Sequence, residues 1–211
     1  GSMLQCDKNH ASIIIWSLGN ELGFGETVAV GAGYCRACDP TRLIHKRQMN
    51  SIADMDSETY PSPENMVEHA KKFPNRMFVT NEYGHAMGNA CGSLKDYWDA
   101  IDTHPQLAGG FVWEWCDHGI LQHDKAGNAY FAYGGDFGEE FHDGNFCIDG
   151  LITADRKETP KLAELKAVHS FIRCYASNLE KGDILVENRY GFIDLSSFDV
   201  QVSLLRDGES V

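Results

Sequence analysis

The sequence predicts an α/β fold with a parallel sheet, followed by a shorter stretch of antiparallel strands. Short apolar runs alternate with segments of helical composition through much of the chain, which is typical of repeated strand–helix–strand units. Several of these runs stop at a polar residue or a carboxylate. Near its end the chain instead alternates apolar and polar residues, which favours antiparallel strands.

The first strand is expected at 12–18, where a β-branched apolar run ends at Gly19-Asn20-Glu21. A run that is apolar on both faces is typical of a strand buried within a parallel sheet. The same pattern predicts further strands at 42–45, weakly at 52–55, at 77–81 before Glu82, and at 110–113 before Glu114.

Helices are expected between these strands at 27–38, 62–72 and 94–103, and later at 160–171. Asp39-Pro40 and His104-Pro105 end the first and third, because a residue before proline is forced out of the helical region. The Gly-rich and aromatic-rich stretch 130–150 is too long for an ordinary connector and is typical of a loop that serves a site. Antiparallel strands are expected across 190–205.

Composition excludes two classes of protein. Apolar residues make up 43% of the chain, and no apolar run approaches the roughly 20 residues that a membrane span needs. The net charge of −13, without a Lys or Arg run, argues against a nucleic-acid partner. The acidic balance suits a neutral substrate, although it would equally serve solubility alone.

The seven cysteines are odd in number and scattered, so they do not indicate a disulfide framework. A reducing compartment, and hence a cytoplasmic protein, is the expectation. Cys35 and Cys38 have CxxC spacing, but no second pair accompanies them, and a position on one helix face is favoured over a zinc site.

Two glutamates each follow an apolar strand and an asparagine, at Asn20-Glu21 and Asn81-Glu82. A carboxyl pair on one rim, roughly 5 Å apart, can hydrolyse a glycosidic bond by acid/base and nucleophilic catalysis. Each could instead be a carboxylate that stabilises a helix N-terminus.

The strings around these glutamates resemble glycoside hydrolase family 2, and specifically its bacterial lactase-type β-galactosidases. The resemblance runs in order through nearly the whole chain, in NHASIIIWSLGNE (9–21), NEYGHAMGN (81–89), GGFVWEWCD (109–117), YGGDFG (133–138) and FCIDGLITADR (146–156). It implies a partial (β/α)8 TIM barrel, about strands four to eight, and then the start of a β-sandwich. It also implies hydrolysis of terminal β-galactosides with retention, with Glu21 as acid/base and Glu82 as nucleophile.

The same resemblance implies sugar-binding roles for four residues. Asn20 would bind the 2-hydroxyl, His85 other ring hydroxyls, and Trp113 would be an aromatic platform. Tyr60 would hydrogen-bond the nucleophile, although the string around it matches the family poorly. Asn20 could instead be only a turn residue, and His85 a structural histidine.

Metal ions enter through the resemblance alone. Glu21 would help to hold a magnesium ion, and the Phe146 carbonyl with the Asp149 side chain would hold sodium, although the family usually has Asn at that last position. Oxygen donors suit both ions. The remaining family ligands lie upstream of this chain, so we expect neither Mg2+ nor Na+ to bind tightly to it.

The expected organisation is a vector remnant at 1–3, the second half of the catalytic barrel at 4–175, and the beginning of a sandwich domain at 176–211, with a boundary near Ala176. Five strands of an eight-stranded barrel leave edges that a homo-oligomer or the tail could cover. We therefore expect the chain alone to be inactive. Its alternatives are a non-catalytic structural fragment and a β-glucuronidase-like or mannosidase member of the family, and the HAMGN string favours the galactosidase.

Overall fold

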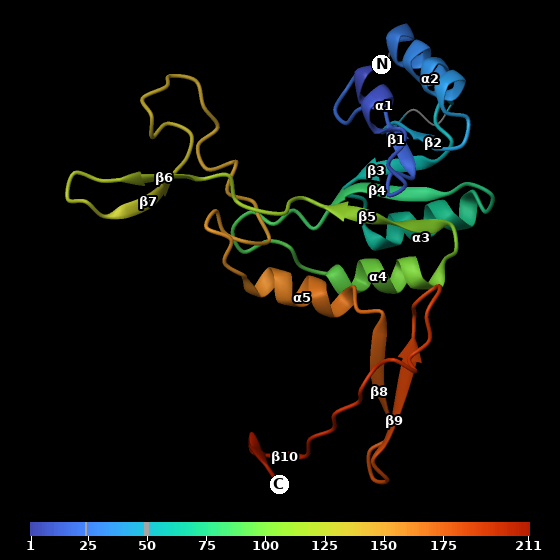
Figure 1. Cartoon of the computed structure of the whole chain (residues 1–211), viewed down its shortest axis with the longest axis vertical. Coiled ribbons are helices and arrows are strands. Elements are labelled where there is room, and N and C mark those ends of the chain that lie inside the picture. The colour runs from blue at the N-terminus through green and yellow to red at the C-terminus, as the bar shows by residue number, and fades with distance from the viewer. Residues whose placement is uncertain (24, 49–50) are drawn as a thin grey trace. The chain divides into compact units, whose positions relative to one another are not determined.

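The computed structural model describes residues 1–23, 25–48 and 51–211, and it divides into two compact units, Gly1–Val168 and His169–Val211 (Figure 1). The first unit contains, in chain order, α1 Ser2–Asp7, β1 Ile15–Ser17, α2 Glu26–Cys38, β2 Leu43–His45, β3 Asp56–Thr59, α3 Pro63–Lys72, β4 Phe78–Tyr83, α4 Leu94–Thr103, β5 Leu107–Val112, β6 Ile120–His123, β7 Ala129–Ala132 and α5 Pro160–Val168. The second contains β8 Ile172–Asn178, β9 Asp183–Asn188, β10 Leu205–Arg206 and β11 Glu209–Ser210.

The first five strands are parallel, as the alternating pattern predicts. β1 pairs with β2 in one sheet, and β4 lies between β3 and β5 in another. Helices α3 and α4 follow β3 and β4 and pack against the same side of the three-stranded sheet (Figure 1). The α/β prediction and its partial barrel are confirmed, and within the described residues the strands do not close into a ring.

Each sheet has its own apolar core. Trp16 of β1 and Ile44 of β2 pack with residues of α1 and α2, including Leu4 and Cys35. In the second sheet, residues of α3 and α4 cover Phe78 and Leu107. A third cluster, around Tyr83, Leu94 and Leu151, joins the end of β4 to α4 and α5. Burial of these side chains supplies the main driving force for each sheet–helix contact.

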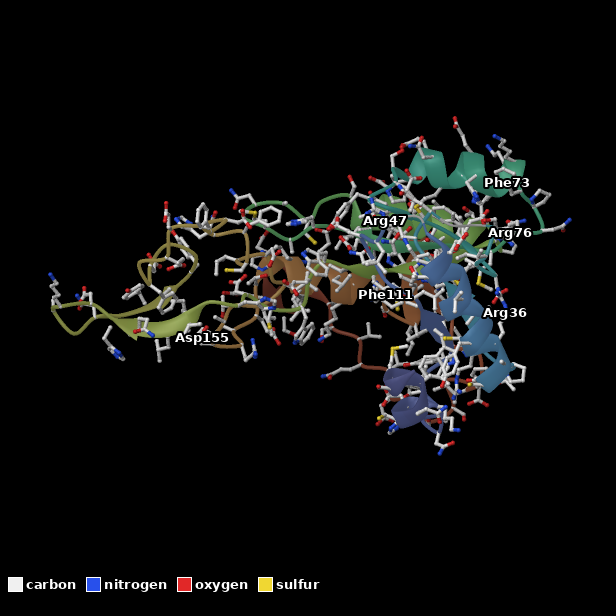
Figure 2. All side chains as sticks on the ribbon, turned by 90° about the horizontal axis from the view of Figure 1, so that it is seen from above. Arg36, Arg47, Phe73, Arg76, Phe111 and Asp155 are labelled. Carbon is white, nitrogen blue, oxygen red and sulfur yellow. The ribbon has the colours of Figure 1, made fainter. Side chains whose placement is uncertain are left out.

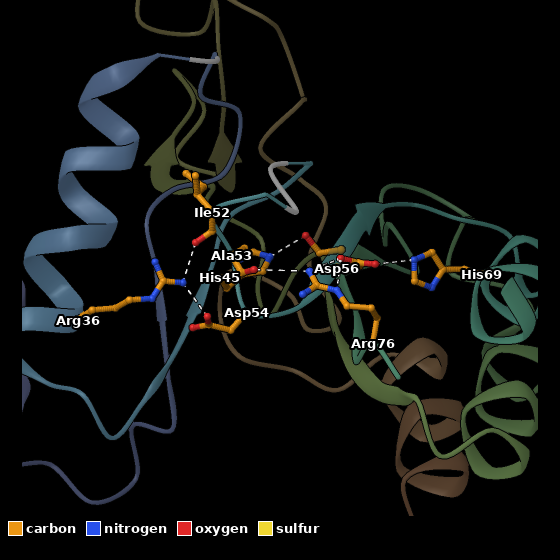
Figure 3. Close-up of polar contacts among 9 residues, drawn as sticks. Arg36, His45, Ile52, Ala53, Asp54, Asp56, His69 and Arg76 are labelled. Carbon is orange, nitrogen blue, oxygen red and sulfur yellow. Dashed lines mark hydrogen bonds and ion pairs between the residues drawn. The ribbon is translucent and has the colours of Figure 1, made fainter. Parts of the chain in front are cut away.

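Within the described residues no strand ladder pairs the two sheets, and polar contacts connect them instead (Figure 3). One of these is a backbone bond, from the Asp54 N–H to the Ile44 carbonyl at 2.9 Å. His45 of β2 hydrogen-bonds Ser57 of β3 through Nε2 at 2.9 Å. The Asp54 carboxylate accepts a hydrogen bond from the Ile44 N–H at 2.7 Å, and Arg36 of α2 donates to the same carboxylate at 2.6 Å. The connection between β2 and β3 therefore depends on polar groups.

The strand predicted at 52–55 lies four residues later, at β3 Asp56–Thr59. The prediction was wrong because it followed the apolar residues, whereas β3 buries polar ones. Asp56 is 4% exposed and accepts hydrogen bonds from Arg76 at 2.6 Å and His69 at 2.9 Å (Figure 3). A buried carboxylate is tolerated when it is paired in this way.

Other boundaries also differ from expectation. β1 begins at Ile15 rather than at Ser12, and β5 begins at Leu107, ahead of the expected Gly110. Residues 2 and 3 lie in α1, whose Leu4 is buried. After Trp115 the chain forms the antiparallel hairpin β6–β7, which periodicity did not predict, and β7 takes the first residues of the 130–150 stretch.

The two longer antiparallel strands of the second unit lie upstream of the predicted range 190–205. β8 and β9 pair over Ile172–Asn188, and only Leu205 of the predicted range lies in a strand. The chain turns after β9, because the Asn188 side chain donates to the Ile193 carbonyl and the Tyr190 ring stacks on Phe171 at 4.8 Å. Ala176 lies inside β8. The sandwich domain stays a prediction.

No helix within the described ranges is both long and apolar enough to cross a membrane.

Candidate active site

Glu82 lies near the carboxyl end of β4 and is held by groups from three strands. Asn20, just after β1, donates from Nδ2 to Glu82 Oε1 at 2.6 Å. Asn81 donates to the Asn20 side-chain oxygen at 3.3 Å and to the Thr59 hydroxyl at 2.8 Å. Because the carboxyl ends of parallel strands lie at one edge of a sheet, these short polar side chains meet there.

Tyr60, directly after β3, contacts Glu82 twice. Its hydroxyl hydrogen-bonds the Glu82 carboxylate, and its N–H donates to the Glu82 carbonyl at 2.8 Å. Burial raises the pKa of Tyr60 far above its ordinary value, and the hydrogen bond and charge of Glu82 raise it further. The hydroxyl therefore stays protonated and can donate to the carboxylate. Tyr60 has a φ of +51°, an uncommon backbone conformation for a bulky residue, and such conformations cluster at functional sites.

Glu21 lies in the bend that follows β1, and 76% of its side chain is exposed. Its carboxylate is 3.7 Å from the Arg47 guanidinium. The neighbouring Asn20 reaches Glu82, so the structure places Glu21 next to a residue that binds the other glutamate. The separation of the two carboxyl groups stays a prediction.

A cavity of about 400 Å³ opens beside Glu82. Its lining comes from the ends of β1, β2, β4 and β5: Ser17, Asn20, His45, Asn81, Glu82, Phe111, Val112, Trp113 and Glu114. The aromatic Phe111 (labelled in Figure 2) and Trp113 are 64% and 38% exposed. An apolar ring beside hydroxyl-binding groups suits one face of a sugar.

A second acidic group lies behind Trp113. Asp149 is 1% exposed and accepts a hydrogen bond from Trp113 Nε1 at 3.0 Å. Burial raises the pKa of Glu114, and so do the hydrogen bond and charge of Asp149. His85 Nε2 is 4.0 Å from the same carboxylate, and the His85 ring contacts Tyr60 at 5.7 Å between centroids. His85 thus joins the Asp149 group to the Glu82 group.

Gly150 fixes the loop that carries Asp149. Its N–H donates to the Asp117 carboxylate at 2.8 Å, and the backbone of Glu114 is bonded to both Asp149 and Leu151. A Cβ at Gly150 would lie 2.1 Å from the Asp117 nitrogen. Only glycine fits this approach of two backbones, which explains why the loop 146–156 lies against the segment after β5.

The predicted metal ligands differ in how well they suit an ion. Within the described residues no three His, Cys, Asp or Glu side chains gather as a metal cluster. Glu21 faces a guanidinium, so the residues of this chain do not by themselves fit a magnesium site. Asp149 differs, because no N–H group among the described atoms donates to its buried Oδ1, although its carboxyl group shares a hydrogen bond with Glu114. An oxygen without an N–H partner fits one ligand position of a sodium ion.

Of the predicted residues, the structure brings Asn20, Glu82, Tyr60, His85 and Trp113 together, while Glu21 lies outside the cavity lining. Phe146 is 60% exposed, but its ring contacts that of His85 at 5.8 Å between centroids. Sequence reasoning missed Ser17 and His45, which end β1 and β2 and line the cavity, and the strand-end position that identified the glutamates could have identified them too. It also missed Lys46, which directly follows β2.

Sequence comparison gives close matches. Residues 1–174 match the family model described as glycosyl hydrolases family 2, TIM barrel domain. A β-galactosidase of Priestia megaterium is 40% identical over 215 residues, covering 100% of this chain and 21% of that protein. A β-galactosidase of Actinobacillus pleuropneumoniae is 43% identical, covering 91% of this chain and 19% of that protein. The chain thus spans about a fifth of the length of these curated relatives.

Solved structures give the same fold. A family 2 glycosyl hydrolase of Bacteroides cellulosilyticus matches with a TM-score of 0.57 at 18% identity, covering 84% of this chain and 23% of that one. A β-glucuronidase of Ruminococcus gnavus matches with a TM-score of 0.52 at 18% identity, covering 78% of this chain and 32% of that one. At such identities the likeness shows the fold alone.

Proposed function

The chain belongs to the TIM barrel domain family of the family 2 glycosyl hydrolases, and from this premise we propose that it carries the catalytic glutamates of a retaining β-galactosidase. One observation carries the proposal. The Glu82 carboxylate is held by the Tyr60 hydroxyl and the Asn20 amide beside a cavity with an aromatic wall. A carboxylate held by two hydrogen-bond donors is oriented as a nucleophile requires.

In the proposed reaction Glu82 attacks the anomeric carbon while Glu21 gives its proton to the departing glycosidic oxygen. A covalent galactosyl-enzyme forms and the aglycone leaves. Glu21, now a carboxylate, takes a proton from water, which attacks the same carbon and releases Glu82. The second Asn20 amide hydrogen remains available for the sugar 2-hydroxyl, because the other is donated to Glu82.

The charge around the cavity favours a neutral sugar over a uronic acid. The lining includes the carboxyl groups of Glu82 and Glu114, and none of its described residues is Lys or Arg. Burial lowers the pKa of His45, and the Lys46 charge lowers it further, so this histidine is neutral at pH 7. A glucuronide carboxylate would meet net negative charge there without a cationic partner.

We include a sodium ion and a magnesium ion in the proposal, and the residues of this chain support the first more than the second. Asp149 and the Phe146 carbonyl would hold sodium, whose charge would offset the buried Asp149 carboxylate. Glu21 would contribute to magnesium binding only with ligands from outside this chain. We also propose a cytoplasmic location, because all seven cysteines are free in the structure, and a homo-oligomer that covers the open sheet edges.

The test is the Glu82→Gln variant of the whole protein, assayed with aryl β-galactosides and aryl β-glucuronides. The amide keeps the size and hydrogen bonding of the carboxylate but is a poor nucleophile, so galactoside turnover should fall by at least about 1,000-fold with the thermal unfolding temperature unchanged. Residual activity within tenfold of the parent would contradict the assignment. Preference for the glucuronide would favour the other family activity, and inactivity of the parent on both would favour a structural role.

A further inference from the structure

A buried lysine lies beside the loop that carries Glu21. Lys46 directly follows β2 and is 2% exposed. Its ammonium donates three hydrogen bonds to carbonyls, at 3.3 Å to Asn20, 3.1 Å to Leu22 and 2.9 Å to Arg47. A lysine ammonium has three donors, and all three are used.

Among the described residues, the hydrogen-bond partners of this ammonium are three carbonyls and no carboxylate, so backbone dipoles compensate its charge. Burial of a charge is costly unless it is fully hydrogen-bonded, which explains why burial lowers the pKa of Lys46. If the side chain at position 46 served only to pack one element against another, an apolar residue would do this as well as a lysine. A cation that binds three carbonyls at one point instead fixes the course of the backbone that presents them.

Two of those carbonyls flank Glu21 in the sequence. The Glu21 side chain is 76% exposed, so packing restrains it little. Its position depends on the backbone of Asn20 and Leu22 and on the Arg47 guanidinium at 3.7 Å (labelled in Figure 2). The third Lys46 hydrogen bond holds the Arg47 backbone, so one ammonium connects both segments that restrain the carboxylate.

We propose that Lys46 is a positioning residue for Glu21, whose ammonium fixes the Asn20–Leu22 backbone so that the carboxyl group meets the departing glycosidic oxygen. The inference rests on the proposed function. Loss of the ammonium would free three carbonyls and release the loop that carries Glu21. Glu82 instead lies within β4 and keeps its hydrogen bond from Tyr60 even where that from Asn20 is weakened. The defect should therefore resemble a partial loss of the acid and not a loss of the nucleophile.

The experiment compares Lys46→Met with the parent, both as the whole protein, on aryl β-galactosides with good and poor leaving groups. Poor leaving groups need protonation by the acid, whereas good ones depart without it. We expect kcat/KM for poor leaving groups to fall by about 10- to 100-fold, and that for good ones by less than about threefold. A 2-fluoro-galactoside that traps Glu82 counts the active sites, so unfolded protein is not mistaken for slow protein.

Lys71→Met, an exposed lysine on α3, is the matched control and should change neither value. If Lys46→Met does not fold, Lys46→Gln provides the test, because its amide keeps donors for the carbonyls and should show a smaller defect of the same selectivity. An equal loss with both kinds of leaving group, or no loss, would overturn the positioning role. Failure of the proposed function would differ, since the parent itself would then show no turnover or no loss in Glu82→Gln.

Discussion

Asn20 occupies the point where the two halves of the site meet. Its side chain contacts Glu82 and Asn81, its carbonyl accepts from Lys46, and its peptide bond leads into Glu21. A shift of its backbone would move Glu21 directly, whereas Glu82 would lose one of its hydrogen bonds but remain within β4. A misplacement of about 1 Å can cost on the order of 100-fold in rate. The polar groups around it therefore act on geometry more than on stability.

Tyr60→Phe should slow galactoside hydrolysis in the whole protein while leaving the fold intact. The substitution removes the hydroxyl that bonds the Glu82 carboxylate, and a hydrogen bond to a charged group contributes about 1.5–3 kcal/mol, so kcat should fall by about 10- to 100-fold. Tyr175→Phe is the matched control, because it removes a hydroxyl bonded to Glu187 in the second unit. Equal rates for Tyr60→Phe and the parent would show that the hydrogen bond between Tyr60 and Glu82 does not contribute to catalysis.

Glu21→Ala should separate the two steps of the reaction. Substrates with good leaving groups should keep their glycosylation rate, because they need little acid assistance, and hydrolysis of the glycosyl-enzyme should become slow. Added azide should restore turnover and give a galactosyl azide of retained configuration, detectable by NMR. Glu68→Ala on α3 should not respond to azide. An unresponsive Glu21→Ala variant would exclude Glu21 as the acid/base.

At the scale of elements, Asp39 connects α2 to the first sheet. It follows the last residue of α2, and its carboxylate accepts hydrogen bonds from Trp16 of β1 at 2.9 Å and from the Thr41 hydroxyl at 2.6 Å. These bonds, with that of Arg42, hold the pKa of Asp39 well below its ordinary value of 3.8. The ionised form therefore belongs to the folded state.

Asp39→Asn should destabilise the chain in a pH-dependent way. Because the folded-state pKa is lowered, the carboxylate stabilises the fold above 3.8, the ordinary value, and this contribution disappears as the pH falls towards the folded-state value. Urea unfolding at pH 7 should show the variant to be less stable, and the difference should shrink below pH 3.8. A difference that is independent of pH would mean that shape and not charge is responsible.

Sequence periodicity located the elements whose buried face is apolar and missed those whose buried groups are polar. β4, which buries Phe78, lies where it was expected. The predicted position of β3 was wrong, because the sequence alone does not show that Arg76 pairs with Asp56 and allows this carboxylate to be buried. The residues of the site were likewise predicted only in part. Glu82 was identified from its strand-end position, but a lysine after a strand is ordinarily exposed, so nothing in the sequence distinguishes Lys46.

At the scale of the whole molecule, the chain by itself should show no measurable β-galactosidase activity. The two parallel sheets leave open edges, and the chain spans about a fifth of the length of its curated relatives. The described lining of the cavity beside Glu82 comes from the ends of four strands, whereas a closed barrel surrounds its site with eight. The assay uses an aryl β-galactoside with the purified 211 residues, and Glu82→Gln controls for contaminating enzyme. Turnover above that control would show that this chain suffices to build the site.

The polar junction between β2 and β3 bears on the partial unfolding of the molecule. Each sheet has its own helices and its own apolar core, while His45, Ser57 and Asp54 bridge them through side chains. Partial unfolding proceeds through contiguous cooperative units that retain their internal contacts. We therefore expect the β1–α2–β2 segment and the β3–β5 segment to open separately, so that amide protons of the first exchange with solvent while those of the second remain protected.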